Sequence, residues 1–357
     1  MSKLKIAHFI ETIELGGVLR NLETLMAEMS DVEHVRYDVQ PRRQLPPVVP
    51  ADHLVVIHFT SSWSKLPFLT ALRAMRGSLP IVIVEHSYTE SYLKYACPSV
   101  SRWRAMARLT YALTDKVVAV SHGQGTWLRK LGIVAPGKVY VIPSSTNCDR
   151  FQNIPPPARR GKIDTPLRIG SCGRYHEQKG YGNLINAMRQ LPEGMVTLRL
   201  AGLGPYENEL RAMSADMPNV TIEGPTADVP GLMASLDVIA MPSRWESFGQ
   251  VALEARAAGR PLISSAVDGL IEQTDKDWGW LVREDDIDGL ALAMRQACEA
   301  DIYSMGEAAR WSAEGHLEMS MDAWRALGAE LMFPKPAIPK PAVVAPSAAS
   351  STDSKAA

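Results

Sequence analysis

Cysteine is scarce in this chain of 357 residues, and its four copies lie far apart in the sequence. Zinc sites and disulfide frameworks are recognised by closely spaced cysteine pairs, and no such pair occurs here. Isolated thiols of this kind are typical of a reduced intracellular protein, so we expect a cytoplasmic location. The four residues are Cys97, Cys148, Cys172 and Cys298.

Long apolar runs are also missing. No stretch of about 18 apolar residues occurs, which argues against a membrane-spanning helix. The first residues lead directly into a strand-like run, Ile6–Ile10, without the apolar segment and cleavage site of a signal peptide. The chain is 46% hydrophobic and 22% charged, as globular proteins are, and its length suits two domains.

Net charge is nearly absent, at −1, but the charges are unevenly distributed. Residues 1–150 carry 18 Lys and Arg against 12 Asp and Glu, whereas the rest of the chain carries 20 against 27. The basic excess is concentrated in residues 91–150. It indicates either an anionic partner, such as a phospholipid surface or a phosphate-bearing acceptor, or simply a solvated basic face. We expect no nucleic acid partner, because no groove motif of basic and aromatic residues stands out.

Short apolar runs alternate with helical patterns along nearly the whole chain. Two such series in tandem predict an α/β protein with two doubly wound, Rossmann-like domains built on parallel sheets. The first series of strands is predicted at Ile6–Ile10, Leu54–Phe59, Ile81–Glu85, Lys116–Val120 and Val139–Ile142. The second is predicted at Leu167–Ser171, Thr197–Ala201, Val220–Glu223, Val238–Met241 and Pro261–Ser264.

A segment with three consecutive prolines separates the two series. Prolines remove hydrogen-bond donors and fix φ, so we predict an interdomain linker over residues 152–166. The linker divides an N-terminal domain, 1–151, from a second domain, 167–310. A helix over 311–333 is expected to pack back toward the N-terminal domain. Residues 334–357 are rich in Pro, Ala and Ser, which predicts a disordered tail.

The first candidate site is the pair Gly16-Gly17, which follows a predicted strand and opens a predicted helix. Glycines at such a turn let backbone amides approach a phosphate, and the helix N-terminus adds positive potential. Glycine can also serve the geometry of the turn alone, and the pair by itself does not separate the two interpretations.

The second candidate site is the segment from Gly173 to Gly180, which follows the first strand of the second domain. Ligands of parallel sheets bind at the carboxyl ends of the strands. Arg174 and Lys179 can there neutralise the charge of a departing diphosphate, a task that a metal ion performs elsewhere, so we expect no metal. The alternative is a pair of solvated cations.

The third candidate site carries two carboxylates around a strand-to-helix turn. Glu246 lies in the loop and Glu254 eight positions later in the helix. A carboxylate accepts paired hydrogen bonds from hydroxyl groups, so one can face a sugar while the other reaches a ribose. The amides from Phe248 to Val251 open the helix, where a phosphate or sugar oxygen would be stabilised. Alternatively, Glu254 is a capping or ion-pairing carboxylate.

Together with Gly202-Leu203-Gly204-Pro205, these segments resemble the family 4 retaining glycosyltransferases, which have the GT-B fold of two Rossmann-like domains facing across a cleft. The similarity runs from about residue 5 to residue 325 and keeps the family's order and spacing. Its decisive motif is Glu246-x7-Glu254. The resemblance implies that the donor diphosphate is bound by Arg174, Lys179, Gly16 and Gly17. It places the ribose and nucleotide at Glu254, Gly202 and Gly204.

The resemblance also implies two catalytic residues. Glu246 would hold the transferred sugar, together with the segment Phe248, Gly249, Gln250 and Val251. His86, at the end of a first-domain strand, would contact a donor hydroxyl or shape the acceptor site. From the sequence alone, a single histidine after a strand is more often structural.

Two segments depart from the family pattern. The family's Ile-Pro-Asn-Gly-Val-Asp is replaced by Ile142-Pro143-Ser144-Ser145-Thr146-Asn147, and its Gly-Gly-x-x-Glu by Asp268-Gly269-Leu270-Ile271-Glu272. Donor or acceptor details are therefore expected to differ from those of typical members.

The activity implied is transfer of a hexose or N-acetylhexosamine from a nucleotide sugar, UDP- or GDP-linked, with no further cofactor. The acceptor would be a lipid-linked or saccharide intermediate of lipopolysaccharide, capsule or exopolysaccharide synthesis. A nucleotide-sugar epimerase of the same fold and a non-catalytic scaffold that binds sugar nucleotides are the alternatives. Residues 101–111 predict a helix with Arg104 and Arg108 on one face and Trp103 and Met106 on another. This helix either contacts an anionic membrane peripherally or packs its apolar side in the core.

Overall fold

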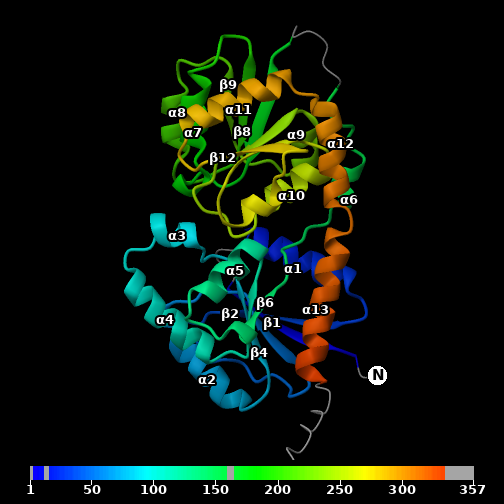
Figure 1. Ribbon diagram of the computed structural model, residues 1–357. Helices are drawn as coiled ribbons and strands as arrows, with labels where there is room; N and C mark the ends of the chain where they lie inside the picture. The colour runs from blue at the N-terminus through cyan, green and yellow to red at the C-terminus, as the bar shows by residue number, and fades with distance from the viewer. Residues whose placement is uncertain (1–2, 12–15, 159–164, 334–357) are drawn as a thin grey trace, which may run out of the picture.

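The computed structural model describes residues 3–11, 16–158 and 165–333. The predicted tail, 334–357, and the middle of the predicted linker lie outside these ranges. The chain forms two lobes, each built around one parallel sheet (Figure 1). Within the described residues, no helix combines the length and the apolar character needed to cross a membrane.

The first sheet has the strand order β2-β1-β3-β4-β5-β6, with all strands parallel. Its strands are β1 (Lys5–Glu11), β2 (Glu33–Val39), β3 (Leu54–Ile57), β4 (Ile81–Glu85), β5 (Lys116–Ala119) and β6 (Val139–Val141). Its helices are α1 (Gly16–Glu28), η1 (Trp63–Lys65), α2 (Leu66–Arg76), α3 (Glu90–Tyr95), α4 (Val100–Ala112), α5 (His122–Lys130) and η2 (Pro136–Lys138). The next helix, α6 (Asp149–Gln152), already lies against the second lobe (Figure 1).

The second sheet has the order β12-β11-β10-β7-β8-β9, again entirely parallel. Its strands are β7 (Leu167–Cys172), β8 (Val196–Ala201), β9 (Val220–Glu223), β10 (Val238–Met241), β11 (Leu262–Ser265) and β12 (Gly279–Val282). The helices are η3 (Glu177–Lys179), α7 (Tyr181–Met188), α8 (Glu207–Met213), α9 (Val229–Ala234), α10 (Gln250–Ala257), η4 (Asp268–Gln273), α11 (Ile287–Glu299), α12 (Ile302–Ala313) and α13 (His316–Met332). Two doubly wound sheets confirm the predicted fold class.

The last helix, α13, runs along the first lobe, whereas α12 lies beside the second (Figure 1). Trp324 and Leu327 of α13 are buried in the same apolar cluster as Ile6 of β1. Ser320 donates a hydrogen bond to the Pro143 carbonyl at 3.0 Å. The chain therefore crosses between the lobes twice, once before β7 and once at α13.

The start of the predicted linker is held by two arginines of the second lobe. Arg310 donates to the Gln152 carbonyl at 2.8 Å, and Arg260 donates to the Pro155 carbonyl at 2.9 Å. Arg260 is 2% exposed, and it also donates to the Met233 carbonyl. A buried guanidinium is stabilised by several carbonyl acceptors of this kind, so the chain entering the linker is fixed to the second lobe.

Helix α4 uses its apolar face inside the first lobe. Trp103 and Met106 are 6% and 3% exposed and pack with the core that includes Phe9. Arg104 and Arg108 lie on the exposed side of the helix. Of the two interpretations of this helix, the core-packing one therefore accounts for its apolar residues.

Candidate active site

The loops at the carboxyl ends of the two sheets meet each other. Ser247, in the loop between β10 and α10, donates a hydrogen bond of 2.5 Å to the carbonyl of His86, which directly follows β4. Lys94 of α3 forms an ion pair of 2.7 Å with Glu284 of the second lobe. This junction holds the predicted site residues of both lobes, and it is where ligands of open α/β sheets bind.

Lys179 and Glu246 are brought into direct contact. The Lys179 Nζ atom lies 2.5 Å from Glu246 Oε2, and the two side chains are 16% and 13% exposed. The Ser243 hydroxyl lies 3.4 Å from the same oxygen. Lys179 is the predicted diphosphate ligand and Glu246 the predicted sugar ligand, so both parts of a nucleotide sugar would meet at one point.

The backbone brings these two loops together. Gln178 donates a side-chain hydrogen bond to the Trp245 carbonyl at 2.9 Å, and its own carbonyl accepts from the amide of Arg244 at 2.8 Å. Gly180 has φ +65°, and a Cβ atom there would collide with the Pro242 carbonyl. Only glycine fits this combination of left-handed backbone and close approach.

Arg174 lies in the same loop as Lys179 but is exposed. Its guanidinium donates to Gln178 Oε1 at 3.3 Å. The side chain is otherwise exposed to solvent, so its role as a ligand of the diphosphate stays a prediction.

Gly202 and Gly204 follow β8 and pack against the segment after β7. A Cβ atom on Gly202 would collide with the Gly173 carbonyl, and one on Gly204 with the backbone of Tyr175. The Tyr175 amide donates to the Leu203 carbonyl at 2.8 Å. These contacts show that the two glycines allow adjacent loops to pack, and that they sit beside the Arg174 loop.

Glu254 is buried within α10, with 8% of its surface exposed. Burial raises the pKa of this carboxyl to about 7, although the charges of Arg20 and Arg150 act in the opposite direction. Arg20 belongs to α1 of the first lobe. Glu254 therefore lies at the junction too, next to the helix that the glycine pair opens.

The glycine pair faces the start of α10. A Cβ atom on Gly17 would lie 2.5 Å from the side-chain oxygen of Gln250, whereas one on Gly16 would meet nothing within 4 Å. Gly249 is the N-cap of α10 with φ +94°. The amides of Gln250 and Val251 belong to the first turn of this helix, whose amides have no intrahelical acceptor.

Phe248 differs from its neighbours because its side chain is 3% exposed and lies 5.6 Å from the ring of His316. It therefore anchors the loop to the core. Only its backbone is suited to contact a ligand.

His86 is half-buried at the same junction. Its Nε2 atom lies 3.3 Å from Nδ1 of His58, and burial lowers the pKa of the ring to about 4. The imidazole is therefore neutral at physiological pH, so it can donate or accept a hydrogen bond but carries no charge.

Two family models match the chain. The first, described as Glycosyltransferase Family 4, matches residues 26–150, and the second, Glycosyl transferases group 1, matches residues 166–300. The two matched segments coincide with most of the first lobe and with the second sheet and its loops.

The chain belongs to the glycosyltransferases that these two models describe, with a family 4 segment followed by a group 1 segment.

Curated relatives of this glycosyltransferase include enzymes of envelope synthesis. A lipopolysaccharide core biosynthesis glycosyltransferase of Rhizobium meliloti is 34% identical over 38% of this chain and 42% of the relative. A GDP-mannose-dependent mannosyltransferase of Corynebacterium glutamicum, acting on a monoacylated phosphatidylinositol monomannoside, is 31% identical over 53% of this chain and 54% of the relative. The chain thus spans about half the length of these relatives.

Solved structures share the fold over nearly the whole chain. Anabaena HepE in complex with UDP and glucose has a TM-score of 0.71 at 18% identity, covering 91% of this chain and all of that one. WaaG, a glycosyltransferase involved in lipopolysaccharide biosynthesis, has a TM-score of 0.64 at 18% identity, covering 89% and 98%. At this level of identity the likeness establishes the GT-B fold alone.

Asp268 is a site residue that sequence reasoning missed, although it was recognised as a departure from the family's glycine. Its backbone has φ +41°. Its carboxylate accepts hydrogen bonds from Thr89 Oγ1 at 2.8 Å and from the amides of Ser91 and Glu246, both at 3.2 Å. One side chain thus joins α3 of the first lobe to the loop that carries Glu246.

Other residues at the junction were also not predicted from the sequence. Trp245 stacks on Tyr95 of α3 with ring centroids 6.5 Å apart, and Arg244 forms an ion pair of 2.8 Å with Asp285. No motif pointed to these residues, because each acts through a partner from another part of the chain.

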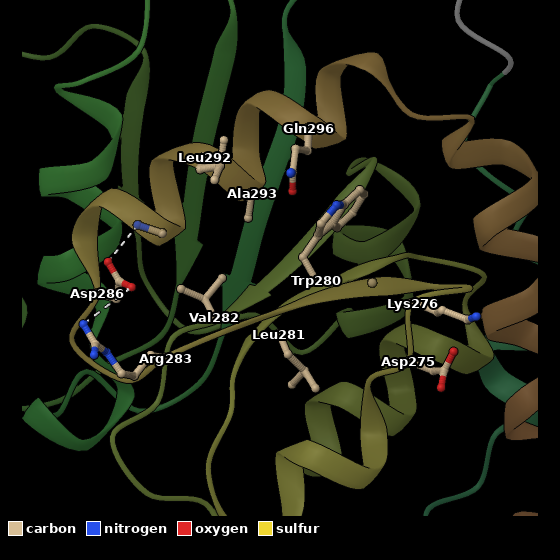
Figure 2. A pocket seen from close by; sticks show the side chains of 12 residues that line it. Asp275, Lys276, Trp280, Leu281, Val282, Arg283, Asp286, Leu292, Ala293 and Gln296 are labelled. Atoms are coloured by element: carbon tan, nitrogen blue, oxygen red, sulfur yellow. Dashed lines mark hydrogen bonds and ion pairs between the residues drawn. The ribbon is translucent and has the colours of Figure 1, made fainter.

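A separate hollow of about 430 Å³ lies between β12 and α11 (Figure 2). Trp280, Leu292 and Arg283 are among its lining residues, and none of the predicted site residues lines it. The hollow is therefore a different surface from the candidate site. Among the described residues, no cluster of three or more His, Cys, Asp or Glu side chains is placed to hold a metal ion.

Proposed function

We propose that this chain is a retaining glycosyltransferase that moves a hexose or N-acetylhexosamine from a nucleotide sugar to an acceptor of envelope polysaccharide synthesis. The observation that carries the proposal is the contact of Lys179 with Glu246, at a junction that also holds Arg174 and Glu254. The names of the relatives support the acceptor class. The UDP and glucose held by HepE support a nucleotide-sugar donor.

In this proposal the donor lies across the loops that follow β7 and β10. Arg174 and Lys179 neutralise the diphosphate, so the leaving group needs no metal ion. Glu254 accepts hydrogen bonds from the ribose hydroxyls as a carboxylate. The glycine pair at the start of α1 leaves room for the phosphates to approach from the first lobe.

The transferred sugar then sits between the lobes. Glu246 and the amides of Gly249 to Val251 hold its hydroxyls from one side, and His86 does so from the other. Transfer with retention takes place on one face of the sugar, with the leaving phosphate accepting the proton of the acceptor hydroxyl. This chemistry demands precise placement of the donor and acceptor rather than a strong base.

The acceptor side of the proposal involves α4. Arg104 and Arg108 lie on its exposed side, and Leu109 is 51% exposed. We propose that this face contacts anionic lipid from the cytoplasm and so brings the chain to a lipid-linked acceptor. Vesicle flotation tests this contact: binding to anionic but not to neutral vesicles, lost in Arg104→Glu/Arg108→Glu, supports it, and no binding contradicts it.

The donor site is tested by thermal shift against UDP-, GDP-, ADP- and dTDP-sugars. Stabilisation by one nucleotide class is expected, and it should be lost in Arg174→Ala. The matched control is Arg283→Ala, because Arg283 is equally charged and exposed but lines the hollow away from the site. No stabilisation by any nucleotide sugar at millimolar concentration would contradict the proposal.

The reaction is tested with the nucleotide sugar identified in this way and an envelope glycan extract as acceptor. NMR of the product should show the anomeric configuration of the donor. Conversion of the nucleotide sugar without an acceptor would instead indicate an epimerase. Tight binding without any turnover would indicate a scaffold.

A further inference from the structure

Four of the eight histidines of the chain lie side by side across the first sheet. His34 is in β2 and His8 in β1, while His58 and His86 directly follow β3 and β4. These four strands are neighbours in the order β2-β1-β3-β4. We call the four residues the histidine ladder.

The ladder lies on the same face of the sheet as part of the apolar core. Alternate residues of a strand share a face, and the residues two positions before His8, His58 and His86 are apolar core residues. The ladder crosses this face diagonally, from His34 near the amino end of β2, through His8 in the middle of β1, to His58 and His86 just after the carboxyl ends of β3 and β4. The inner rings, His8 and His58, are 3% and 4% exposed.

Three ring-to-ring hydrogen bonds connect the ladder. His34 Nδ1 lies 3.0 Å from His8 Nε2, and His8 Nδ1 lies 3.0 Å from His58 Nε2. The last bond, of 3.3 Å, joins His58 Nδ1 to His86 Nε2. Both nitrogens of each inner ring are thus engaged with another histidine.

The rings of the ladder are neutral at physiological pH. Burial lowers the pKa of His8 to about 3 and that of His86 to about 4, and it lowers the pKa of His58 well below its ordinary value. Burial also lowers the pKa of His34, where Asp31 and the Met29 carbonyl act in the opposite direction and Lys3 acts with burial. A neutral imidazole carries one proton, on one nitrogen only.

Each neutral ring carries one proton, and each of the three hydrogen bonds needs one proton. Only two arrangements of the protons along the ladder meet both conditions. If His58 carries its proton on Nδ1 and donates to His86, its Nε2 must accept from Nδ1 of His8. The Nε2 atom of His8 must then accept from Nδ1 of His34. In the opposite arrangement, every ring carries its proton on Nε2. Any mixture of the two places two protons, or two lone pairs, in one hydrogen bond.

We propose that His34, His8 and His58 are positioning residues that hold His86 in a single tautomer, shared by all four rings. In one arrangement the Nδ1 atom of His86 is a hydrogen-bond donor, and in the other it is an acceptor. Among the described residues Nδ1 of His86 has no hydrogen-bond partner, so this atom is available to a ligand. The tautomer of His34 on the outer strand and the hydrogen-bonding character of His86 at the lobe junction are thereby coupled.

We assign to the ladder the role of fixing the tautomers of its rings, not that of a proton relay to solvent. The Nε2 atom of His34 is buried and has no hydrogen-bond partner among the described residues. The consequence of the ladder for catalysis rests on the proposed function. Nδ1 of His86 meets a sugar hydroxyl either always as a hydrogen-bond donor or always as an acceptor.

The proposal is tested on the full chain labelled with nitrogen-15 at histidine, using long-range proton–nitrogen correlation spectra from pH 6 to 8. Single histidine variants assign the signals. The expected result is four neutral rings with the same nitrogen protonated, unchanged over this range. Opposite tautomers within the ladder, or a doubly protonated ring, would overturn the proposal. This measurement needs no substrate, so its failure is distinct from failure of the proposed function.

Coupling along the ladder is tested with His34→Phe, which removes the ring furthest from His86. The nitrogen-15 resonances of His86 should move toward the average of the two tautomers, although His34 does not touch His86. His53→Phe is the matched control, because His53 is buried in the same lobe but bonds to Asp52 outside the ladder. An unchanged His86 in a folded His34→Phe protein would contradict the proposal, and His34→Gln gives the same test if the phenylalanine is not tolerated.

Discussion

Each partner of the Lys179–Glu246 ion pair competes with the ligand proposed for the other. Their atoms lie 2.5 Å apart in a setting that is mostly shielded from water. A diphosphate must draw Lys179 toward itself, and this releases Glu246 for the sugar hydroxyls. The pair therefore keeps both side chains in place before the donor arrives, since removing one partner leaves the other charge unpaired.

A double-mutant cycle separates the structural from the catalytic contribution of the pair. Lys179→Ala should lower the free energy of unfolding by about 1–3 kcal/mol, because it leaves the Glu246 carboxylate without its cation. Lys179→Ala/Glu246→Gln should recover part of that loss, as measured by chemical denaturation. Transfer should fall by roughly 100-fold or more in both proteins. If the double variant loses as much stability as Lys179→Ala and Glu246→Gln lose together, the two residues do not interact.

Glu254 should make stability depend on pH. Its pKa is about 7 when folded against 4.5 ordinarily, so between these values the folded chain binds more protons at this carboxyl than the unfolded chain does. Stability should therefore fall as pH rises through this window, by at most about 3 kcal/mol. Denaturation at pH 5 and pH 8 should show a smaller fall in Glu254→Gln. Glu299→Gln, at an exposed glutamate of α11, should keep the fall of the parent protein.

The same carboxyl should release a proton when a nucleotide sugar binds. Ribose hydroxyls donate to the carboxylate, so binding lowers the pKa of Glu254 from about 7. Donor affinity should accordingly rise with pH and level off above about pH 7. Calorimetry in two buffers of different ionisation enthalpy measures the released proton. Proton release that persists in Glu254→Gln would assign it to another group.

At the scale of the elements, the loop from β7 to α7 depends on the backbone of Gly180. Gly180→Ala should destabilise the chain by more than Gly132→Ala. Both glycines have nearly the same φ, +65° and +67°, but only Gly180 faces a carbonyl, that of Pro242. The positive φ alone costs about 1 kcal/mol, which is the effect expected at Gly132. Thermal denaturation compares the two, and equal losses would mean that the contact with Pro242 is relaxed easily.

Most strands of the two sheets were predictable, and two of the edge strands were not. All ten predicted strands are present within one or two residues of their predicted ends. The two that were missed, β2 and β12, each form one edge of their sheet. β2 has exposed or half-buried residues at most positions, and β12 begins with a glycine and buries only its first and last residues, so neither shows the apolar pattern of a buried strand.

Part of the candidate site is predicted from residues that follow the strands of the second lobe. Lys179, Glu246 and Glu254 each lie in a loop or helix that follows a strand, and the structure brings Lys179 and Glu246 into contact, whereas the binding roles of all three stay a prediction. The contacts of Asp268 and the link of His86 to His58, His8 and His34 were not predicted. Their partners are 22 to 179 residues away in the chain, and only the pairing of strands and lobes brings them together.

At the scale of the whole molecule, two carboxylates of η4 connect the lobes through helix N-termini. Asp268 accepts from the Ser91 amide near the start of α3, and Glu272 accepts from the Gly123 amide at the start of α5, at 3.0 Å. Helix N-termini favour negative charge, so both contacts are electrostatically matched. Because Asp268 also holds the Glu246 amide, docking of the lobes and placement of the sugar ligand are coupled.

Asp268→Gly/Glu272→Ala should therefore loosen the lobes without unfolding either of them. Glycine accepts the φ of +41° at position 268 without strain, so the change removes the carboxylate contacts alone. A hydrogen bond to a charged group contributes about 1.5–3 kcal/mol, so the donor KM should rise by roughly 10- to 100-fold. Small-angle X-ray scattering should show a larger radius of gyration, which Asp277→Ala, at an exposed aspartate that follows η4, should not cause. If scattering and KM both stay unchanged, the remaining contacts, such as the Ser247 bond to His86, suffice to dock the lobes.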